Sequence, residues 1–198
     1  MSSTLAELRS LVPPRRGLTI HEAEQITERQ ATRLLALTGI TGPPVPSAVI
    51  ADLPRIYVAR ETVLPDSGLP IPASGSSHWN GQKWVIVVNG DEPRTRQRFS
   101  LAHEFKHVMD HPFRTQLYPR CRGYLPEERW EHIAHYFAAS LLMPRQWIKR
   151  VWASERMQDV ADLAQLFEVS QTAMEIRLLK LGLLEPGLRW IARTKEHA

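Results

Sequence analysis

The sequence has little cysteine, no long apolar run and no marked excess of charge of one sign. Its single cysteine, Cys121, excludes an internal disulfide, as is typical of proteins that fold in a reducing cytosol. The longest apolar stretches, such as residues 84–88, are far shorter than the run of about 18 residues that a membrane span needs. The first residues include the acidic Glu7 and contain no apolar segment of the kind found in signal peptides. We therefore expect no secretory signal and a cytoplasmic location.

The net charge is small and evenly spread. The chain has 25 Lys and Arg against 21 Asp and Glu, a formal net charge of +4, and neither half forms a basic domain. Binding to nucleic acid requires basic side chains gathered on one face. Arg94, Arg96 and Arg98 come closest to such a cluster, and we interpret them as solvated or ion-paired residues in the first turns of a helix. Direct contact with nucleic acid is therefore not favoured.

The composition indicates one ordinary core. The chain has 198 residues, of which 43% are hydrophobic and 23% charged, close to the averages for globular proteins. We expect a tail or short leading helix over residues 1–17, one domain over 18–184 and a C-terminal tail over 185–198. Strand signals lie before residue 92 and helix signals after it, which predicts an α+β domain with a small antiparallel sheet.

Local signals place the elements along the chain. Thr19 and Glu22 form a capping box ahead of a helix expected over 20–38, which Gly39 ends. Asn80-Gly81, between β-forming residues, predicts a hairpin. The other expected segments are a short helix capped by Ser47 and reaching Leu53, a β-like segment over 55–60, a surface loop over 65–77, helices over 92–111 and 126–143, a helix opened by Pro144, and two short helices between 159 and 181.

One of these helices carries a chemical motif. His103-Glu104-Phe105-Lys106-His107 matches the pattern H-E-x-x-H within a segment of helical apolar spacing. Residues four apart lie about 40° apart around a helix, so both imidazoles can point at one metal ion. Glu104 is rotated by about 100° from His103, which suits a general base better than a ligand. The alternative is a pair of ordinary histidines on an amphipathic helix.

A catalytic zinc site of this kind needs a third protein ligand. His111 lies about 12 Å along the helix from His103, so we interpret it as a cation at the helix C-terminus. In the second long helix, Glu128, Glu131 and His135 share one stripe. Glu128 is already explained as an acid in the first turn, where the helix dipole favours it. Spacing leaves all three candidates open, with Glu131 ahead.

Two blocks of the chain together resemble a known family. They are RFSLAHEFKH at 98–107 and EHIAHYFAASLLMP at 131–144, and they look like the ImmA/IrrE family of bacterial zinc-dependent metalloproteases, with a likeness that covers about residues 18–184. The resemblance implies a gluzincin-like peptidase in which His103, His107 and Glu131 hold one zinc ion, or manganese or another divalent metal, and Glu104 is the base. It also implies a function, namely cleavage of a helix-turn-helix repressor that switches on mobile-element or stress-response genes.

The chain departs from this family at two positions. His135 stands where the family usually has Asn, and Glu168 stands where a Gly commonly begins a turn. We expect His135 to support the metal site from beside a ligand. His135, Tyr136 and Tyr124 are also candidate donors to the oxyanion, although Tyr136 beside an aromatic residue is more typical of packing.

Two further segments indicate binding roles. The strand expected over 84–89 is either a sheet edge that receives an extended peptide or a plain core strand. Residues 157–184 have the rhythm of a helix-turn-helix with Ser170 as a cap. Its second helix begins with only Gln171 and Thr172 as DNA-reading side chains, so structural packing is favoured. The alternative function is a DNA- or protein-binding regulator, or an antitoxin component, that keeps the peptidase fold without catalysis.

Overall fold

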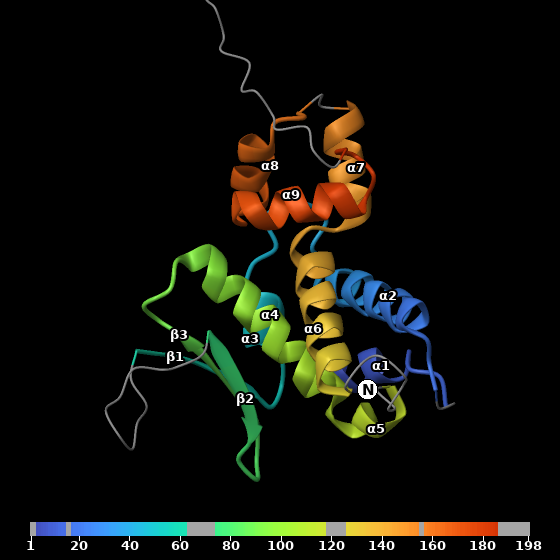
Figure 1. The fold of residues 1–198 in the computed structure, drawn as a ribbon. Helices are drawn as coiled ribbons and strands as arrows, with labels where there is room; N and C mark the ends of the chain where they lie inside the picture. Colours follow the sequence, from blue (N-terminus) through green and yellow to red (C-terminus); the bar gives the residue numbers. More distant parts are fainter. Residues whose placement is uncertain (1–2, 15–16, 63–73, 118–125, 155–156, 186–198) are drawn as a thin grey trace, which may run out of the picture.

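The computed structural model describes residues 3–14, 17–62, 74–117, 126–154 and 157–185, and it has a mixed α+β architecture. Helix α4 (Arg94–Asp110) lies between a small sheet and helix α6 (Pro126–Leu142), and α2 (Ile20–Thr38) packs against α6 (Figure 1). The other helices are α1 (Thr4–Arg9), α3 (Ala48–Ala51), α5 (Arg114–Leu117), α7 (Arg145–Ser154), α8 (Val160–Phe167) and α9 (Gln171–Lys180). Helices α7, α8 and α9 form an upper layer above the start of α4 and the end of α6 (Figure 1).

The sheet is mixed rather than antiparallel. Strands β1 (Ile56–Glu61), β2 (Gly75–Trp79) and β3 (Trp84–Asn89) lie in the order β1-β3-β2. The predicted Asn80-Gly81 hairpin joins β2 and β3, which are antiparallel, whereas β1 runs parallel to β3. The expectation of an antiparallel sheet is thus wrong for β1, because no tight turn joins β1 to its partner and the intervening chain can return it in the same direction.

The central position of β3 settles its role. Because β3 pairs on both sides, the hypothesis that residues 84–89 form a sheet edge is wrong, and their unbroken apolar side chains suit a core strand. In the described part of the chain, β2 pairs on one side alone and is an edge. The loop expected over 65–77 is also wrong at its end, since Gly75–Ser77 belong to β2. Residues 63–73 lie outside the described residues.

Helix boundaries follow the local signals closely. Thr19 and Glu22 form both hydrogen bonds of the capping box, and Gly39 ends α2 in the left-handed conformation at φ 70°, which confirms the helix over 20–38. Ser47 makes no side-chain capping bond, contrary to expectation, and α3 stops at Ala51. Pro112 ends α4 as expected, although a short 3-10 turn and α5 follow. None of the described helices is both long enough and apolar enough to cross a bilayer.

The first described residues pack onto the domain. Helix α1 places Leu8 in the main hydrophobic cluster with no exposed surface, and Val12 joins a second cluster. The guanidinium of Arg9 donates to the backbone carbonyls of Val108 and Met109 at the end of α4. Of the two expectations for residues 1–17, the structure has the leading helix, and the packed body begins ahead of residue 18.

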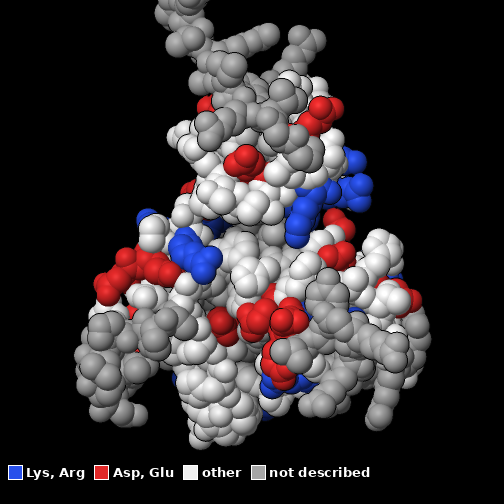
Figure 2. All heavy atoms as spheres, viewed as in Figure 1, with Lys and Arg blue, Asp and Glu red and all other residues white. Residues whose placement is uncertain are grey.

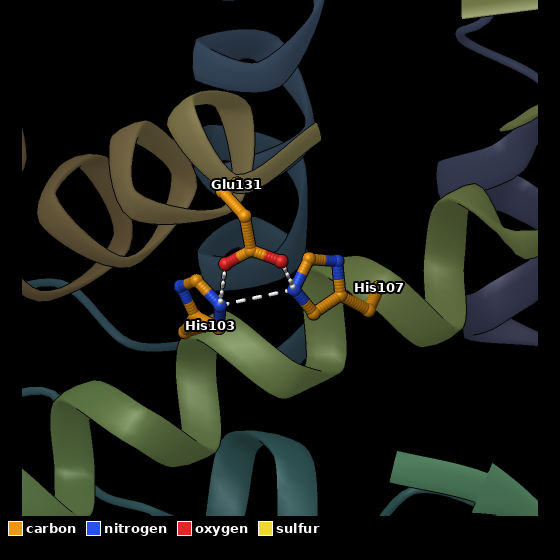
Figure 3. Close-up of side chains that lie close together, drawn as sticks. All are labelled: His103, His107 and Glu131. Atoms are coloured by element: carbon orange, nitrogen blue, oxygen red, sulfur yellow. Dashed lines mark hydrogen bonds and ion pairs between the residues drawn. The ribbon is translucent and has the colours of Figure 1, made fainter. Parts of the chain in front are cut away.

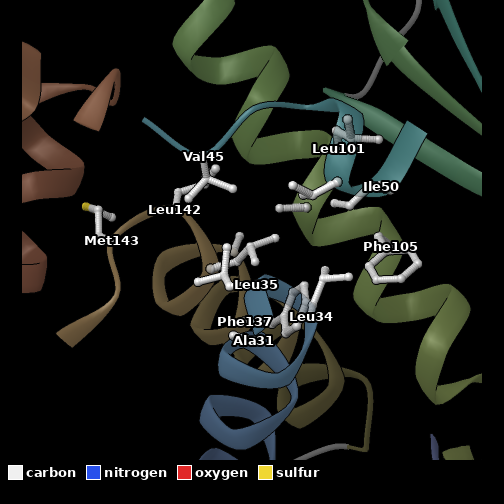
Figure 4. Packing of buried hydrophobic residues seen from close by; sticks show 14 of the residues in the cluster. Ala31, Leu34, Leu35, Val45, Ile50, Leu101, Phe105, Phe137, Leu142 and Met143 are labelled. Carbon is white, nitrogen blue, oxygen red and sulfur yellow. The ribbon is translucent and has the colours of Figure 1, made fainter. Parts of the chain in front are cut away.

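The main core joins α2, α4 and α6 through apolar side chains such as Leu34, Phe105 and Phe137 (Figure 4). On α6, Ala134 and Ala138 have no exposed surface, and small side chains of this kind let two helix backbones approach closely. The close packing of α6 on α4 brings the polar stripe of α6 over the motif of α4.

A buried ion pair fixes the side of α4 that faces away from the sheet edge β2. Lys106 is almost completely buried, and its Nζ donates to Oδ1 of Asp110 at 2.8 Å and to Oε1 of Gln30 at 2.7 Å. Gln30 in turn donates to the backbone carbonyl of Leu8 at 3.1 Å. Burial lowers the pKa of Lys106, and the neighbouring Asp110 carboxylate opposes that shift. The network ties α1, α2 and α4 together behind the motif.

The upper layer is joined to α4 by an arginine. Helices α8 and α9 form where two short helices were expected, and they are separated by three residues that begin at Glu168. Glu168 takes a left-handed conformation at φ 50°, which a glycine would adopt without strain. Arg98 donates to the backbone carbonyl and to the carboxylate of Glu168, the latter at 2.8 Å, and so stabilises this turn.

Candidate metal centre

Helix α4 places both motif histidines on the side that faces α6. The Nε2 atoms of His103 and His107 are 2.9 Å apart, and their ring centroids are 4.6 Å apart. Two residues four apart on a helix meet in this way because one turn separates them along the axis. The helical placement of the motif is thus confirmed.

Helix α6 supplies the carboxylate that faces them. Glu131 Oε2 lies 3.2 Å from Nε2 of His103, and Oε1 lies 3.3 Å from Nε2 of His107 (Figure 3). The ligand atoms of the three residues all lie within 4.8 Å of one another, and within the described ranges no other group of three His, Cys, Asp or Glu side chains meets this condition. Of the three stripe candidates, Glu131 is the one that joins the two histidines in this group.

The donor set fits a divalent metal ion. Burial lowers the pKa of His103 to about 3 and that of His107 to about 4, with further lowering by nearby positive or imidazole groups. Both imidazoles are therefore neutral at pH 7, and each can offer a lone pair. Two neutral imidazoles and one carboxylate are the ligands of one common type of catalytic zinc site, which leaves a fourth position for water or substrate.

Glu104 lies beside this group and is held by the sheet edge. Its side chain is buried, and Ser77 of β2 donates to Glu104 Oε2 at 2.9 Å. Burial raises the pKa of Glu104, and the hydrogen bond from Ser77 partly opposes the shift. The backbone of β2 passes so near that a Cβ at Gly75 would lie 3.1 Å from Glu104 Cγ, which explains a glycine at this position.

Ser77 and Gly75 were not identified from the sequence. They lie 27 and 29 residues before Glu104, in a segment with the composition of a loop, so no local periodicity connects them with the motif. The hairpin signal at Asn80-Gly81 was the available clue, because a hairpin that leads into the motif helix must bring one strand back along that helix.

His135 lies next to a ligand and outside the three-residue group. Its Nδ1 is 2.8 Å from the backbone carbonyl of Glu131, and its ring centroid is 4.5 Å from that of His103. Its ring also lies 5.8 Å from that of Phe99. The position suits the supporting role expected for His135, which stays a prediction.

The other candidates lie elsewhere. Tyr136 faces away from the centre, where its hydroxyl donates to Glu28 at 3.4 Å, so it is not brought to the oxyanion position. Tyr124 lies outside the described residues. His111 packs on Trp84 with 5.0 Å between ring centroids, and Glu128 does not belong to the three-residue group.

An aromatic wall was also missed. The Trp130 ring lies edge-on to the His107 ring at 4.4 Å between centroids, and the Arg114 guanidinium lies 3.8 Å from the centroid of the Trp130 ring. Trp130 immediately precedes Glu131 on α6, so the turn that carries the carboxylate also packs on the second histidine. Its contact restricts the orientation of the His107 ring.

His103, His107, Glu131 and Glu104 line a cleft of about 420 Å³ between α4, α6 and the start of β2. Arg96 stands at its rim, where it donates to Ser74 at 3.0 Å and lies 3.8 Å from the Glu92 carboxylate. The interpretation of Arg96 and Arg98 as ion-paired residues is therefore confirmed. On the face in Figure 2, acidic side chains gather where α4 and α6 meet, and basic side chains lie above them.

Comparisons with known proteins identify the family and the fold of the chain. Residues 62–179 match the peptidase family described as the IrrE N-terminal-like domain. A comparison with curated proteins finds no match. Among solved structures, a Mycobacterium tuberculosis transcriptional regulator matches with a TM-score of 0.59 and 21% identity, over 89% of this chain and 52% of that chain. The chain thus spans about half the length of that regulator, and at this identity the likeness shows the fold.

Proposed function

Because the chain belongs to the ImmA/IrrE family, whose domain is described as IrrE N-terminal-like, we propose that it is a zinc-dependent endopeptidase. The observation that carries the proposal is the convergence of His103, His107 and Glu131 beside a second, separately held carboxylate, Glu104. A pair of ordinary histidines on an amphipathic helix requires neither of these carboxylates. The donor set also accepts manganese or another divalent metal.

Each residue of the centre has a distinct task in this proposal. A zinc ion held by the three ligands would supply Lewis acidity toward water and toward the scissile carbonyl. Glu104 removes a proton from the attacking water and passes it to the leaving amine. Ser77 holds Oε2 of Glu104, which leaves Oε1 to receive the proton. The raised pKa of Glu104 makes it a stronger base than an exposed carboxylate.

We propose that the substrate binds along the edge strand β2. Ser74, Gly75 and Ser77 line the cleft, and β2 has a free side within the described structure. An extended peptide can add to such an edge through backbone hydrogen bonds. We therefore propose that the extended peptide binds along β2 rather than along β3 (residues 84–89). Strand β2 lies directly beside Glu104, the proposed base.

The proposed substrate is a helix-turn-helix repressor of the XRE type. Its cleavage in the cytoplasm would derepress mobile-element or stress-response genes. Family membership supports this proposal, as does the fold shared with the Mycobacterium tuberculosis transcriptional regulator.

A role in DNA binding without catalysis has less support. Helix α9 exposes Gln171 and Thr172, but its basic residue Arg177 is buried and donates to the backbone carbonyl of Met143. A side chain used in this way cannot neutralise a phosphate. We therefore propose that α8 and α9 serve chiefly in packing above the centre.

The test is incubation of the purified protein, loaded with zinc or manganese, with a helix-turn-helix repressor encoded beside it. We expect the wild-type protein to cut the repressor into two fragments. Glu104→Gln is the matched control, and it should retain the metal but slow cleavage by at least about a hundredfold, because it removes the base and little else. An intact repressor after incubation with the metal-loaded wild-type protein would favour the binding-only alternative.

A further inference from the structure

A second hollow opens beside the cleft. It has a volume of about 510 Å³ and lies between the first turns of α4, the upper part of α6 and α9. We call it the α6–α9 groove. Most of its exposed surface is apolar, and Ala139, Ala173 and Ile176 are among its apolar lining residues that are not buried. Ile176 is 50% exposed, so it presents apolar surface at the groove mouth.

The groove is continuous with the candidate metal centre. Arg96, Phe99 and His135 line both the cleft and the α6–α9 groove. The Phe99 and His135 rings are 5.8 Å apart, and the His135 ring is 4.5 Å from that of His103. An extended chain advances about 3.3 Å per residue, so a peptide cut at the centre would reach the groove within a few residues of the scissile bond.

The charged side chains of the groove are all basic. Arg96, Arg177 and Lys180 line it, and no Asp or Glu does. Arg177 is buried and lies 3.8 Å from the Glu28 carboxylate, and Arg96 lies near Glu92, so both are partly neutralised. Lys180 is exposed and makes no ion pair among the described residues, and its Nζ lies 5.8 Å from the Tyr136 ring centroid. Figure 2 shows basic side chains over this part of the face, above the acidic ones.

We propose that the α6–α9 groove is a specificity site that binds a segment of the protein substrate carrying a large apolar side chain next to an acidic one. The apolar side chain fills the space beside Ile176, and the carboxylate meets Lys180 at the rim. This inference rests on the proposed function, since the occupant is taken to be the substrate. It adds a sequence preference that the metal centre itself does not supply.

The experiment measures peptide binding rather than cleavage. The zinc-loaded Glu104→Gln protein is titrated against three fluorescein-labelled 12-residue peptides with a common Gly/Ser frame, and fluorescence anisotropy reports the dissociation constants. One peptide carries a Leu-Asp pair, the second Leu-Lys and the third Ser-Asp. We expect the Leu-Asp peptide to bind about tenfold more tightly than either of the others, because only this peptide offers both the buried side chain and the opposite charge.

Variants of exposed residues assign the preference to the groove. Lys180→Glu should weaken binding of the Leu-Asp peptide about fivefold and strengthen binding of the Leu-Lys peptide. Ile176→Ser should weaken binding of both Leu peptides about fivefold. The matched controls are Lys149→Glu on α7 and Leu179→Ser on α9, which are exposed and line no part of the groove, and they should leave all three constants within about twofold.

Two results would overturn the inference. One is equal affinity for the three peptides, or equal changes in the groove variants and their controls. The other is a dimer that Ile176→Ser dissociates with no change in peptide binding, which would assign the groove to a second copy of the chain. Failure of the proposed function is seen separately, as an intact repressor after incubation with the wild-type protein, and it does not affect the anisotropy measurements.

Discussion

The two sides of helix α4 use polar groups in opposite ways. On one side, the Lys106 ammonium pairs with Asp110 at 2.8 Å, and the chain supplies both charges. On the other, His103 and His107 converge with Glu131, and the group contains three electron-pair donors and no ammonium or guanidinium. The first arrangement is complete within the protein and stabilises the fold. The second suits an added cation, and the comparison therefore separates a structural network from a proposed functional one on the same helix.

The largest effect should come from breaking the structural side. Asp110→Ala leaves the Lys106 ammonium buried without its main partner, and breaking a buried pair in this way costs about 3–5 kcal/mol of unfolding free energy. Denaturation by urea, followed by circular dichroism, measures the change. Asp52→Ala at an exposed position is the control and should change the unfolding free energy by less than about 0.5 kcal/mol. Similar losses in the two variants would show that the network is not structural.

The two histidines on the cleft side of α4 should make the stability of the metal-free protein sensitive to acid. Burial lowers the pKa values of His103 and His107 to about 3 and about 4, whereas both titrate near 6.5 when unfolded. The unfolded state therefore binds more protons below pH 6.5, and unfolding free energy falls as the pH falls, by about 2 kcal/mol for each histidine at pH 5. Denaturation across pH 8 to 5 in the presence of a chelator measures this loss.

Single histidine variants sharpen this comparison. His103→Gln should remove about half of the loss, because only one of the two buried imidazoles is then left to titrate. Unfolding free energies of the wild-type protein that do not change between pH 8 and 5 would contradict the neutral state assigned to the buried pair.

A smaller effect concerns the proposed base. Ser77→Ala removes the hydrogen bond to Glu104 without removing the carboxylate, and we expect kcat to fall about tenfold with the metal content unchanged. Ser76→Ala on the same strand, whose side chain does not line the cleft, is the matched control. Equal kcat values for the two variants would show that Ser77 does not position Glu104.

The smallest effect on activity is expected at His135, where the chain departs from the family pattern. His135→Asn should keep one metal ion per chain and lower activity by less than about tenfold, because His135 contacts a ligand and lies outside the three-residue group. Metal analysis and cleavage rates test this together. Loss of the metal in His135→Asn would make His135 a ligand and reverse the assignment.

Local signals predicted most of the fold. The capping box at Thr19, the Asn80-Gly81 hairpin and the helical spacing around His103 each depend on residues close in the sequence, and each is found where it was expected. The stripe on one helix is also a local pattern, and it narrowed the third ligand to Glu128, Glu131 and His135. Features that depend on distant contacts were missed, namely the parallel pairing of β1 with β3 and the hydrogen bond from Ser77 to Glu104.

The orientation of a side chain on its helix was the other source of error. Tyr136 was a candidate at the centre, but it follows His135 on α6 and so is rotated by about 100° toward Glu28 and the α6–α9 groove. Periodicity places such a residue on a face. Which neighbour covers that face depends on the packing of helices distant in the sequence.

The most direct test of the central claim is a measurement of metal bound per chain. The wild-type protein and Glu131→Ala are treated with a chelator, reloaded with zinc, dialysed and analysed by mass spectrometry of the metal. The account predicts one ion per chain in the wild-type protein and almost none in Glu131→Ala, because two imidazoles alone do not complete the site. One tightly bound ion in both proteins, or none in either, would contradict it.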